Sequence, residues 1–224
     1  MPRRAASHAR PKTTARGKRG KPAARADFAA VEKLILEGLE TELGGIQVYE
    51  TAIQCAENDD LREEWEKYLD QTRNHESIYR DCCEKLGIDA KRETPGRAVV
   101  RSIGEAFVAA MKKAQAEGEP GQAQVVAAEC VVLAETKDHA NWELIGDCCE
   151  ALPQEQAQVL QDAYDEVEDE EDEHLYHTMG WARELWLGQL GLKADLPPPE
   201  EKQHVKSAIG QARAKAERER ELAR

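Results

Sequence analysis

Four segments of the chain carry apolar residues at alternating spacings of three and four positions, which keeps side chains on one face of an α-helix. The first of these apolar stripes includes Val31, Ile35, Tyr49 and Ala52, and Glu42 takes one position in its middle. Each of the other three stripes is interrupted in the same way by a carboxylate, a histidine or both. The pattern predicts helices that pack around a common core and point ionisable side chains into it.

Turn residues separate these segments and predict the helix boundaries. The helices are expected over residues 27–58, 60–86, 97–117, 121–151 and 154–189, and the one over 97–117 lies in a long connection. Short turns make the helices that they join antiparallel, whereas the long connection lets the second and third bundle helices run parallel. The sequence therefore predicts an all-α protein, an antiparallel four-helix bundle with one long crossover that carries an extra helix.

Counting residues from the turns places the inward-facing ionisable groups at one level of the bundle. Glu42 lies about sixteen residues before the first turn and His75 about fifteen after it, at 1.5 Å of rise per residue. The candidate metal ligands are Glu42, His75, Glu135, His139, Glu171 and His174. On the third bundle helix a neighbouring stripe through Glu129 fits the apolar pattern nearly as well, so the choice between Glu135 and Glu129 stays open.

Several carboxylates on converging buried faces need compensating positive charge, because an unpartnered buried carboxylate is costly unless it becomes protonated. Lys and Arg are absent from the four stripes. A divalent metal ion meets the requirement, and carboxylate and imidazole ligands together suit iron or manganese, with zinc also open. The alternative interpretation is a structural polar layer that binds no metal.

Two sequence motifs add to this picture. Glu171 to His174 form a Glu-x-x-His motif, and Tyr49 follows Glu42 by seven residues. In these features the chain resembles, over about residues 27–190, the ferritin-like superfamily of ferritins, bacterioferritins, rubrerythrins and manganese catalases. The resemblance implies a dinuclear iron or manganese site. It also implies ferroxidase, peroxide-scavenging or catalase-like chemistry, with dioxygen or hydrogen peroxide as the substrate.

The second bundle helix departs from this family, since Thr72 stands three residues before His75, where the family has a Glu. One carboxylate ligand is therefore missing. Three interpretations remain open: His139, one turn from Glu135, replaces the lost ligand, the second metal binds weakly, or the site is mononuclear.

Charge is distributed unevenly along the chain, whose formal net charge is −13. Residues 1–26 contain nine Lys or Arg and no Asp or Glu, which predicts a disordered basic arm. Residues 27–192 are expected to form the bundle, and residues 193–224 a Pro-rich linker with a charged tail. The arm supports a rival function, in which a helical bundle with a weak or degenerate metal site binds DNA phosphates without sequence specificity.

No run of about 18 apolar residues occurs, so neither a transmembrane helix nor a membrane partner is expected. Six cysteines without a secretory signal peptide indicate free thiols in a reducing compartment. Four of them form two Asp-Cys-Cys-Glu copies, at 81–84 and 147–150, for which packing in the core is favoured over soft-metal or redox roles. We therefore expect a cytoplasmic, homo-oligomeric metal-binding protein of oxidative or metal stress.

Overall fold

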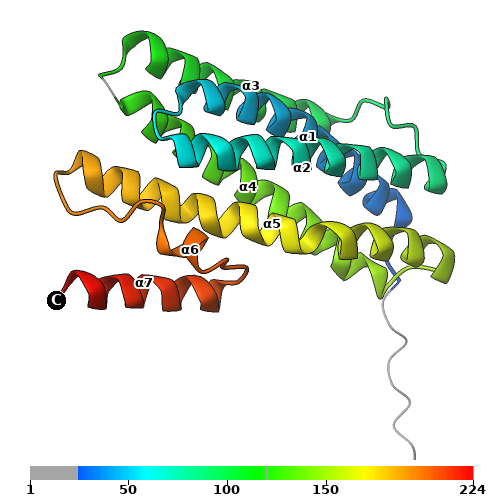
Figure 1. Ribbon diagram of the computed structural model, residues 1–224. Coiled ribbons are helices and arrows are strands. Elements are labelled where there is room, and N and C mark those ends of the chain that lie inside the picture. The colour runs from blue at the N-terminus through cyan, green and yellow to red at the C-terminus, as the bar shows by residue number, and fades with distance from the viewer. Residues whose placement is uncertain (1–24, 120, 224) are drawn as a thin grey trace, which may run out of the picture.

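The computed structural model describes residues 25–119 and 121–223, and over these residues it is all-helical, with no strand (Figure 1). The helices are α1 (Phe28–Cys55), α2 (Asp59–Leu86), α3 (Pro95–Glu117), α4 (Gln122–Cys149), α5 (Gln154–Gln189), α6 (Pro199–Lys202) and α7 (Ala208–Leu222). The predicted fold class is confirmed at this level. The basic arm expected over residues 1–26 lies almost entirely outside the described residues.

Local capping explains why the helix boundaries fall close to the predicted ones. The side chains of Asp27, Asn58 and Thr94 accept hydrogen bonds from backbone N–H groups in the first turns of α1, α2 and α3. α2 ends at Gly87, whose φ of 70° is a left-handed conformation that favours glycine. These signals depend only on neighbouring residues, so the sequence alone predicts the helix ends.

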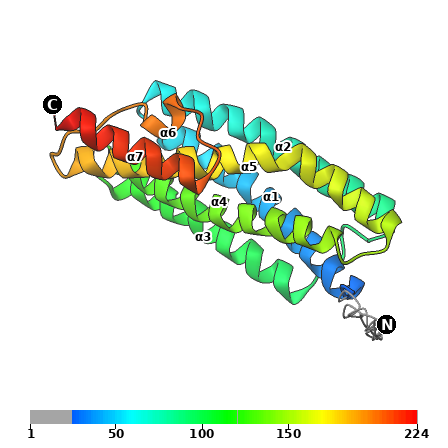
Figure 2. The same ribbon diagram turned by 90° about the horizontal axis from the view of Figure 1, so that it is seen from below.

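Four of the helices form the bundle. α1 packs against α2 and α4, and α5 packs against the same two helices, so α1 and α5 lie on one diagonal. From α1 to α5, each helix runs opposite to the one before it. Because α3 lies between them in the chain, α2 and α4 run parallel to each other (Figure 1). α3 runs the length of the bundle and packs on the outer side of α1 and α4 (Figures 1 and 2).

A buried ion pair attaches α3 to α1. Arg97 Nη2 lies 2.7 Å from Glu40 Oε2, Arg101 Nε donates to Glu40 Oε1 over 2.7 Å, and both Arg97 and Glu40 are buried. Burial by itself would raise the pKa of Glu40, but hydrogen bonds from Arg101 and Arg97 bring that pKa below its usual value. Beside the pair, a Cβ added at Gly104 would lie 3.4 Å from the Cα of Gly44, so the two helix backbones approach closely there.

The apolar core consists of two clusters, one toward each end of the bundle. One is built around residues such as Val48, Trp65 and Trp181, and the other around residues such as Ile35 and Trp142. Along every bundle helix, the stretch between the two clusters carries buried polar residues instead. The bundle therefore has a polar layer near its middle, closed by apolar packing at both ends.

The two Asp-Cys-Cys-Glu copies contribute to the apolar cluster that contains Trp142. Cys82, Cys83 and Cys149 are buried in or against this cluster, Cys148 is partly exposed, and none of the four forms a disulfide. Burial raises the pKa of the Cys82 thiol to about 12, which disfavours the reactive thiolate. The positions agree with the core interpretation of these residues.

The C-terminal segment packs along α5. α6 contacts both α5 and α7, Arg218 Nη2 donates to Glu184 Oε2 over 2.8 Å, and Ala214 of α7 is fully buried. The expected charged tail is thus docked through its described residues.

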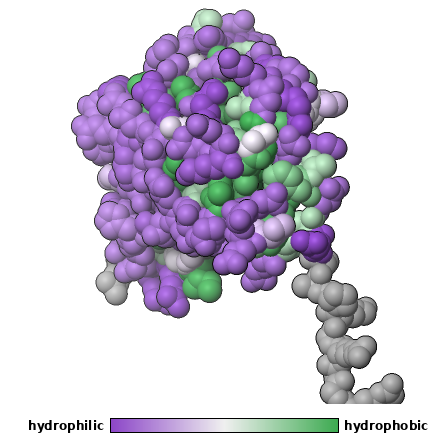
Figure 3. Space-filling view, turned by 90° about the vertical axis from the view of Figure 1, so that its right-hand side faces the viewer, coloured by the Kyte–Doolittle hydropathy of each residue, from purple (hydrophilic) through white to green (hydrophobic). Residues whose placement is uncertain are grey.

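The surface at the end of the molecule nearest the α4–α5 turn is hydrophilic over most of its area, with a smaller apolar area near its middle (Figure 3). Within residues 25–119 and 121–223, no helix is both long enough and apolar enough to cross a membrane.

Candidate metal centre

Five of the six predicted ligands meet in the polar layer of the bundle. α1 contributes Glu42, α2 contributes His75, α4 contributes Glu135, and α5 contributes both Glu171 and His174. Each of these side chains is almost completely shielded from solvent. The apolar stripes of four helices therefore converge on one level, as the count of residues from the turns indicated.

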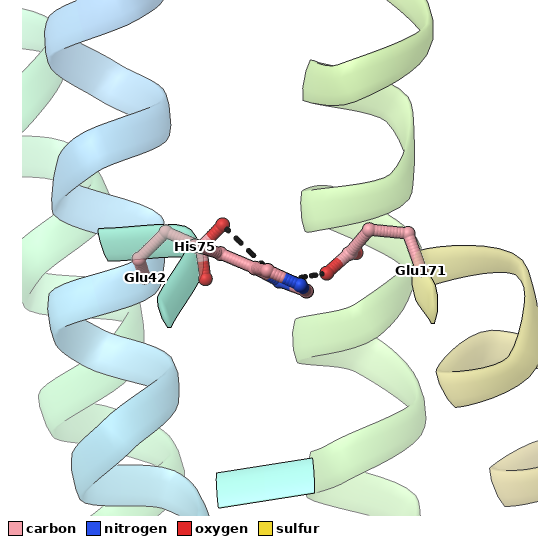
Figure 4. A group of neighbouring side chains, drawn as sticks. All are labelled: Glu42, His75 and Glu171. Atoms are coloured by element: carbon pink, nitrogen blue, oxygen red, sulfur yellow. Dashed lines mark ion pairs between the residues drawn. The ribbon is translucent and has the colours of Figure 1, made fainter. Parts of the chain in front are cut away.

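The first half of the layer is formed by Glu42, His75 and Glu171, which point toward one another from three helices (Figure 4). His75 Nδ1 lies 2.9 Å from Glu171 Oε1 and 4.0 Å from Glu42 Oε1. The Glu42 carboxylate also contacts Trp142, whose Nε1–H donates to Glu42 Oε1 over 3.0 Å. This indole holds one carboxylate oxygen and leaves the other facing the interior.

The second half is formed by Glu135, Glu171 and His174. His174 Nδ1 lies 3.5 Å from Glu135 Oε2 and 3.7 Å from Glu171 Oε1. The hydroxyl of Tyr49 donates to Glu135 Oε1 over 2.7 Å. Glu171 therefore belongs to both groups of potential ligands.

The outer nitrogens of the two imidazoles have partners that orient the rings. His75 Nε2 lies 2.8 Å from Glu170 Oε2, and His174 Nε2 lies 3.0 Å from Gln71 Oε1. In metal sites, such outer partners set the tautomer and aim the opposite nitrogen at the ion. Here that opposite nitrogen is Nδ1 in both rings, and both face the polar layer.

Several inward atoms of the layer lack a hydrogen-bond partner. In this layer they are Glu42 Oε2, Glu135 Oε2, Asp138 Oδ1, Glu171 Oε2 and His174 Nδ1. Buried polar atoms are nearly always hydrogen-bonded, so five unpartnered atoms in one layer require an explanation. All five are carboxylate oxygen or imidazole nitrogen atoms, the donor set that iron, manganese and zinc accept.

The structure differs from the prediction at His139, which lies outside this layer. His139 Nδ1 is 3.3 Å from Asp172 Oδ1, and its Nε2 is 3.5 Å from Glu143 Oε1, near the surface between α4 and α5. The inward stripe of α4 passes through Val131, Glu135, Asp138 and Trp142, not through Val132 and His139. Spacings of three and four both stay on one helix face, so the residues alone did not distinguish Asp138 from His139.

Asp138 is the member of the layer that the sequence analysis missed. Its signal is its position three residues after Glu135, which is also the spacing of Glu171 and His174 on α5. Thr72, which stands where the second helix lacks a Glu, is buried and donates to the carbonyl oxygen of Tyr68. Asp138 brings the number of carboxylates in the layer to four without a contribution from Thr72.

The alternative ligand on α4, Glu129, is exposed. Its Oε1 accepts a hydrogen bond from Trp186 Nε1 over 2.8 Å at the protein surface. Of the two alternatives that the sequence left open, only Glu135 faces the core.

Burial and like-charge repulsion shift the pKa values of the ionisable groups in the layer. Burial raises the pKa of Glu42 well above its usual value, and the charges of Asp138 and Glu171 raise it further. Burial also raises the pKa of Asp138, with Glu171 and Glu135 adding to the effect. For His75, burial lowers the pKa, but Glu170 and Glu171 overcome it and raise the value to about 10. Two divalent ions would balance the four carboxylates charge for charge, with both imidazoles neutral.

A second group of ionisable residues lies one helical turn farther along α5. It contains Glu64, Glu173 and His177, and His177 is buried. His177 Nδ1 lies 2.8 Å from Glu64 Oε1, while Lys67 is paired with Glu173. Since a lysine already compensates one of its carboxylates, this group needs a metal ion less than the central layer does.

No protein-family model, no curated protein and no solved structure matches this chain in the comparisons.

Proposed function

We propose that this protein is a ferritin-like metal-binding protein that holds two iron or manganese ions in the middle of its bundle. The observation that carries the proposal is the shared Glu171, which joins two groups of three potential ligands. The five unpartnered buried atoms of the layer support it, because two divalent cations would give them partners and neutralise four carboxylates. The parallel α2 and α4, joined by a long connection, support the ferritin-like topology.

In this proposal each half of the layer would hold one ion. Glu42 and His75 would bind the first ion, Glu135 and His174 the second, and Glu171 would be shared by the two. Asp138 would supply the carboxylate that is missing at Thr72, which favours a dinuclear over a mononuclear site. The layer thus departs from the family pattern by taking its fourth carboxylate from α4 instead of α2.

Reduced iron or manganese in such a site would supply electrons to dioxygen or hydrogen peroxide. The protein would limit water access to the ions and orient their ligands. Apolar clusters on both sides of the layer limit the access of bulk water, and the Tyr49 hydroxyl holds Glu135 in its orientation. We propose ferroxidase or peroxide-scavenging activity in oxidative or metal stress as the physiological role.

The direct test is the metal content per chain, measured by plasma mass spectrometry after expression with added iron and manganese. We expect about two ions per chain for the wild-type protein and almost none for Glu171→Ala/His174→Ala. Glu42→Ala and Glu135→Ala each remove a ligand from one half, so each should retain about one ion. Glu129→Ala, which removes an exposed carboxylate from α4, is the matched control and should retain two.

Two results would contradict the proposal. One is a wild-type protein without metal, and the other is an equal metal content in the wild-type protein and the double variant. If two ions are bound, the rates of dioxygen and peroxide consumption by the reduced protein then distinguish an oxidase from a peroxidase.

A further inference from the structure

A cavity between α4 and α5 leads from the protein surface to the central layer. It has a volume of about 110 Å³, and its lining residues include His139, Trp142, Glu143, Glu168, Glu171 and Asp172. Trp142 and Glu171 also belong to the central layer, where Trp142 donates to Glu42. The inner end of the cavity is therefore a wall of the candidate metal centre.

The ionisable side chains that line this cavity range from exposed to buried. The exposed fraction is 65% at Glu143, 25% at Asp172, 17% at His139 and 1% at Glu171. At the inner end, Glu171 Oε2 is buried and has no hydrogen-bond partner. The cavity thus connects exposed carboxylate and imidazole groups with this buried carboxylate oxygen.

The charge of the cavity suits a cation. Glu143, Glu168, Glu171 and Asp172 all line it, and no Lys or Arg is among the described residues that do so. A second cavity of about 260 Å³ shares Glu143 with the first and adds Asp147 at its rim. Acidic clefts with low-dielectric walls concentrate cations and accelerate their association.

The cavity on the opposite side of α4 is a poor route for cations by comparison. It lies between α1, α3 and α4 and has a volume of about 120 Å³. Its lining is mostly apolar, with Val48, Val100 and Phe107, and its charged members are Lys137 and Glu40. A hydrated divalent ion would meet a mostly apolar surface there, because the Glu40 carboxylate is already paired with Arg97 and Arg101.

We propose that divalent cations reach the centre between α4 and α5, with Glu143, His139 and Asp172 as a transit site for the partly dehydrated ion. The inference depends on the proposed function, because it assigns the path to the same centre. It also explains the position of His139, which lies between two carboxylates at the outer part of the path. These groups replace lost water ligands in turn before the ion reaches Glu171.

The test is the rate of loading by Co²⁺, a probe that absorbs visible light when carboxylate and imidazole groups bind it. Metal-free wild-type protein and Glu143→Gln/Asp172→Asn are mixed with Co²⁺ in a stopped-flow instrument at low ionic strength. We expect the double variant to load about tenfold more slowly, with the same final Co²⁺ content and a weaker dependence on salt. His139→Ala should also load more slowly and reach the same final content.

The matched control is Glu63→Gln/Glu66→Gln, which removes two exposed charges from α2, away from the cavity. It should load at the wild-type rate. Loading of the Glu143 and Asp172 variant at the wild-type rate, or equal slowing in the control, would overturn the path while leaving the centre intact. A lower final content at an unchanged rate would also overturn it, because the two residues would then act within the centre. A wild-type protein that binds no Co²⁺ would refute both the path and the proposed function.

Discussion

Individual carboxyl groups of the central layer are expected to destabilise the metal-free protein. Glu42 and Asp138 are buried beside other carboxylates, and the layer contains no Lys or Arg among the described residues to neutralise them. A carboxyl group whose pKa is raised by burial destabilises the folded state above its usual pKa, and a neutral group of the same shape avoids that cost. Bound cations are expected to remove this destabilisation. A substitution that removes one of these carboxylates should therefore stabilise the metal-free protein and lower its metal content.

Glu42→Gln should show both effects. The amide oxygen of Gln can still accept the Trp142 hydrogen bond, while the like-charge repulsion from Asp138 and Glu171 disappears. We expect the metal-free variant to be more stable than the metal-free wild type at pH 8 by about 1 kcal/mol or more, a rise in Tm of about 2–4 °C. Differential scanning calorimetry measures it, and the metal content of the variant should fall. A lower Tm would contradict the argument, and Glu66→Gln, at an exposed site on α2, serves as the control.

The stability of the metal-free protein should also fall as the pH rises. The raised pKa values of Glu42 and Asp138 mean that the folded state keeps protons that the unfolded state has released above about pH 4. The pKa of His75, about 10, acts with the same sign between about pH 6.5 and 10. We expect Tm to decline from pH 5 to pH 9 without metal, and bound metal to remove most of this decline. An increase in Tm over that range would show that other groups dominate.

At the scale of elements, a buried ionic contact joins α3 to α1. α3 lies outside the bundle, and Arg97 and Arg101 in its first turns bind Glu40. Both Arg97 and Glu40 are buried, so removing one partner leaves the other without its opposite charge in the interior. Farther along the helix, Met111 is buried in the apolar cluster that contains Trp65. The ionic contact and the apolar packing thus hold different parts of α3.

Glu40→Ala should cost about 3–5 kcal/mol of unfolding free energy, because it leaves Arg97 buried without a carboxylate. Glu93→Ala removes the exposed partner of Arg101 and should cost less than about 1 kcal/mol. Urea unfolding of the two variants measures both values. Similar small losses in the two variants would show that Arg97 finds water or other acceptors, and that α3 is held mainly by apolar contacts.

At the scale of the whole molecule, an acidic body carries a basic segment. The net charge is −13, although residues 1–26 contain nine Lys or Arg and no acid. The body alone would repel nucleic acid, so any DNA binding must depend on this segment. The rival function, protection or binding of DNA, can therefore be tested separately from metal binding.

Deletion of residues 1–26 separates the two functions. For the full chain, the DNA-binding interpretation predicts an affinity that falls steeply with salt, with a slope of about −0.9 for each phosphate neutralised. The truncated protein should lose this affinity and retain the wild-type metal content. Fluorescence anisotropy with labelled duplex DNA measures the slope. Undiminished DNA binding by the truncated chain, or none by the full chain, would contradict a role of the arm.

The chain by itself determined the helices and most of the polar layer, because both depend on local periodicity. Glu42, His75, Glu171 and His174 each take a single position on a clear apolar stripe, so their inward direction followed from the helix geometry. Caps and turn residues likewise placed the helix ends within a few residues.

Only the tertiary structure decided what depends on the relative rotation of packed helices. On α4, two stripes that differ by one residue fit the same apolar pattern, and packing against α1 and α5 turned Asp138 inward and His139 toward the surface. The same rotation exposed Glu129 and placed His139 in the cavity that leads to Glu171. Helical periodicity specifies a face to within about one residue, and the contacts between neighbouring helices select among the remaining choices.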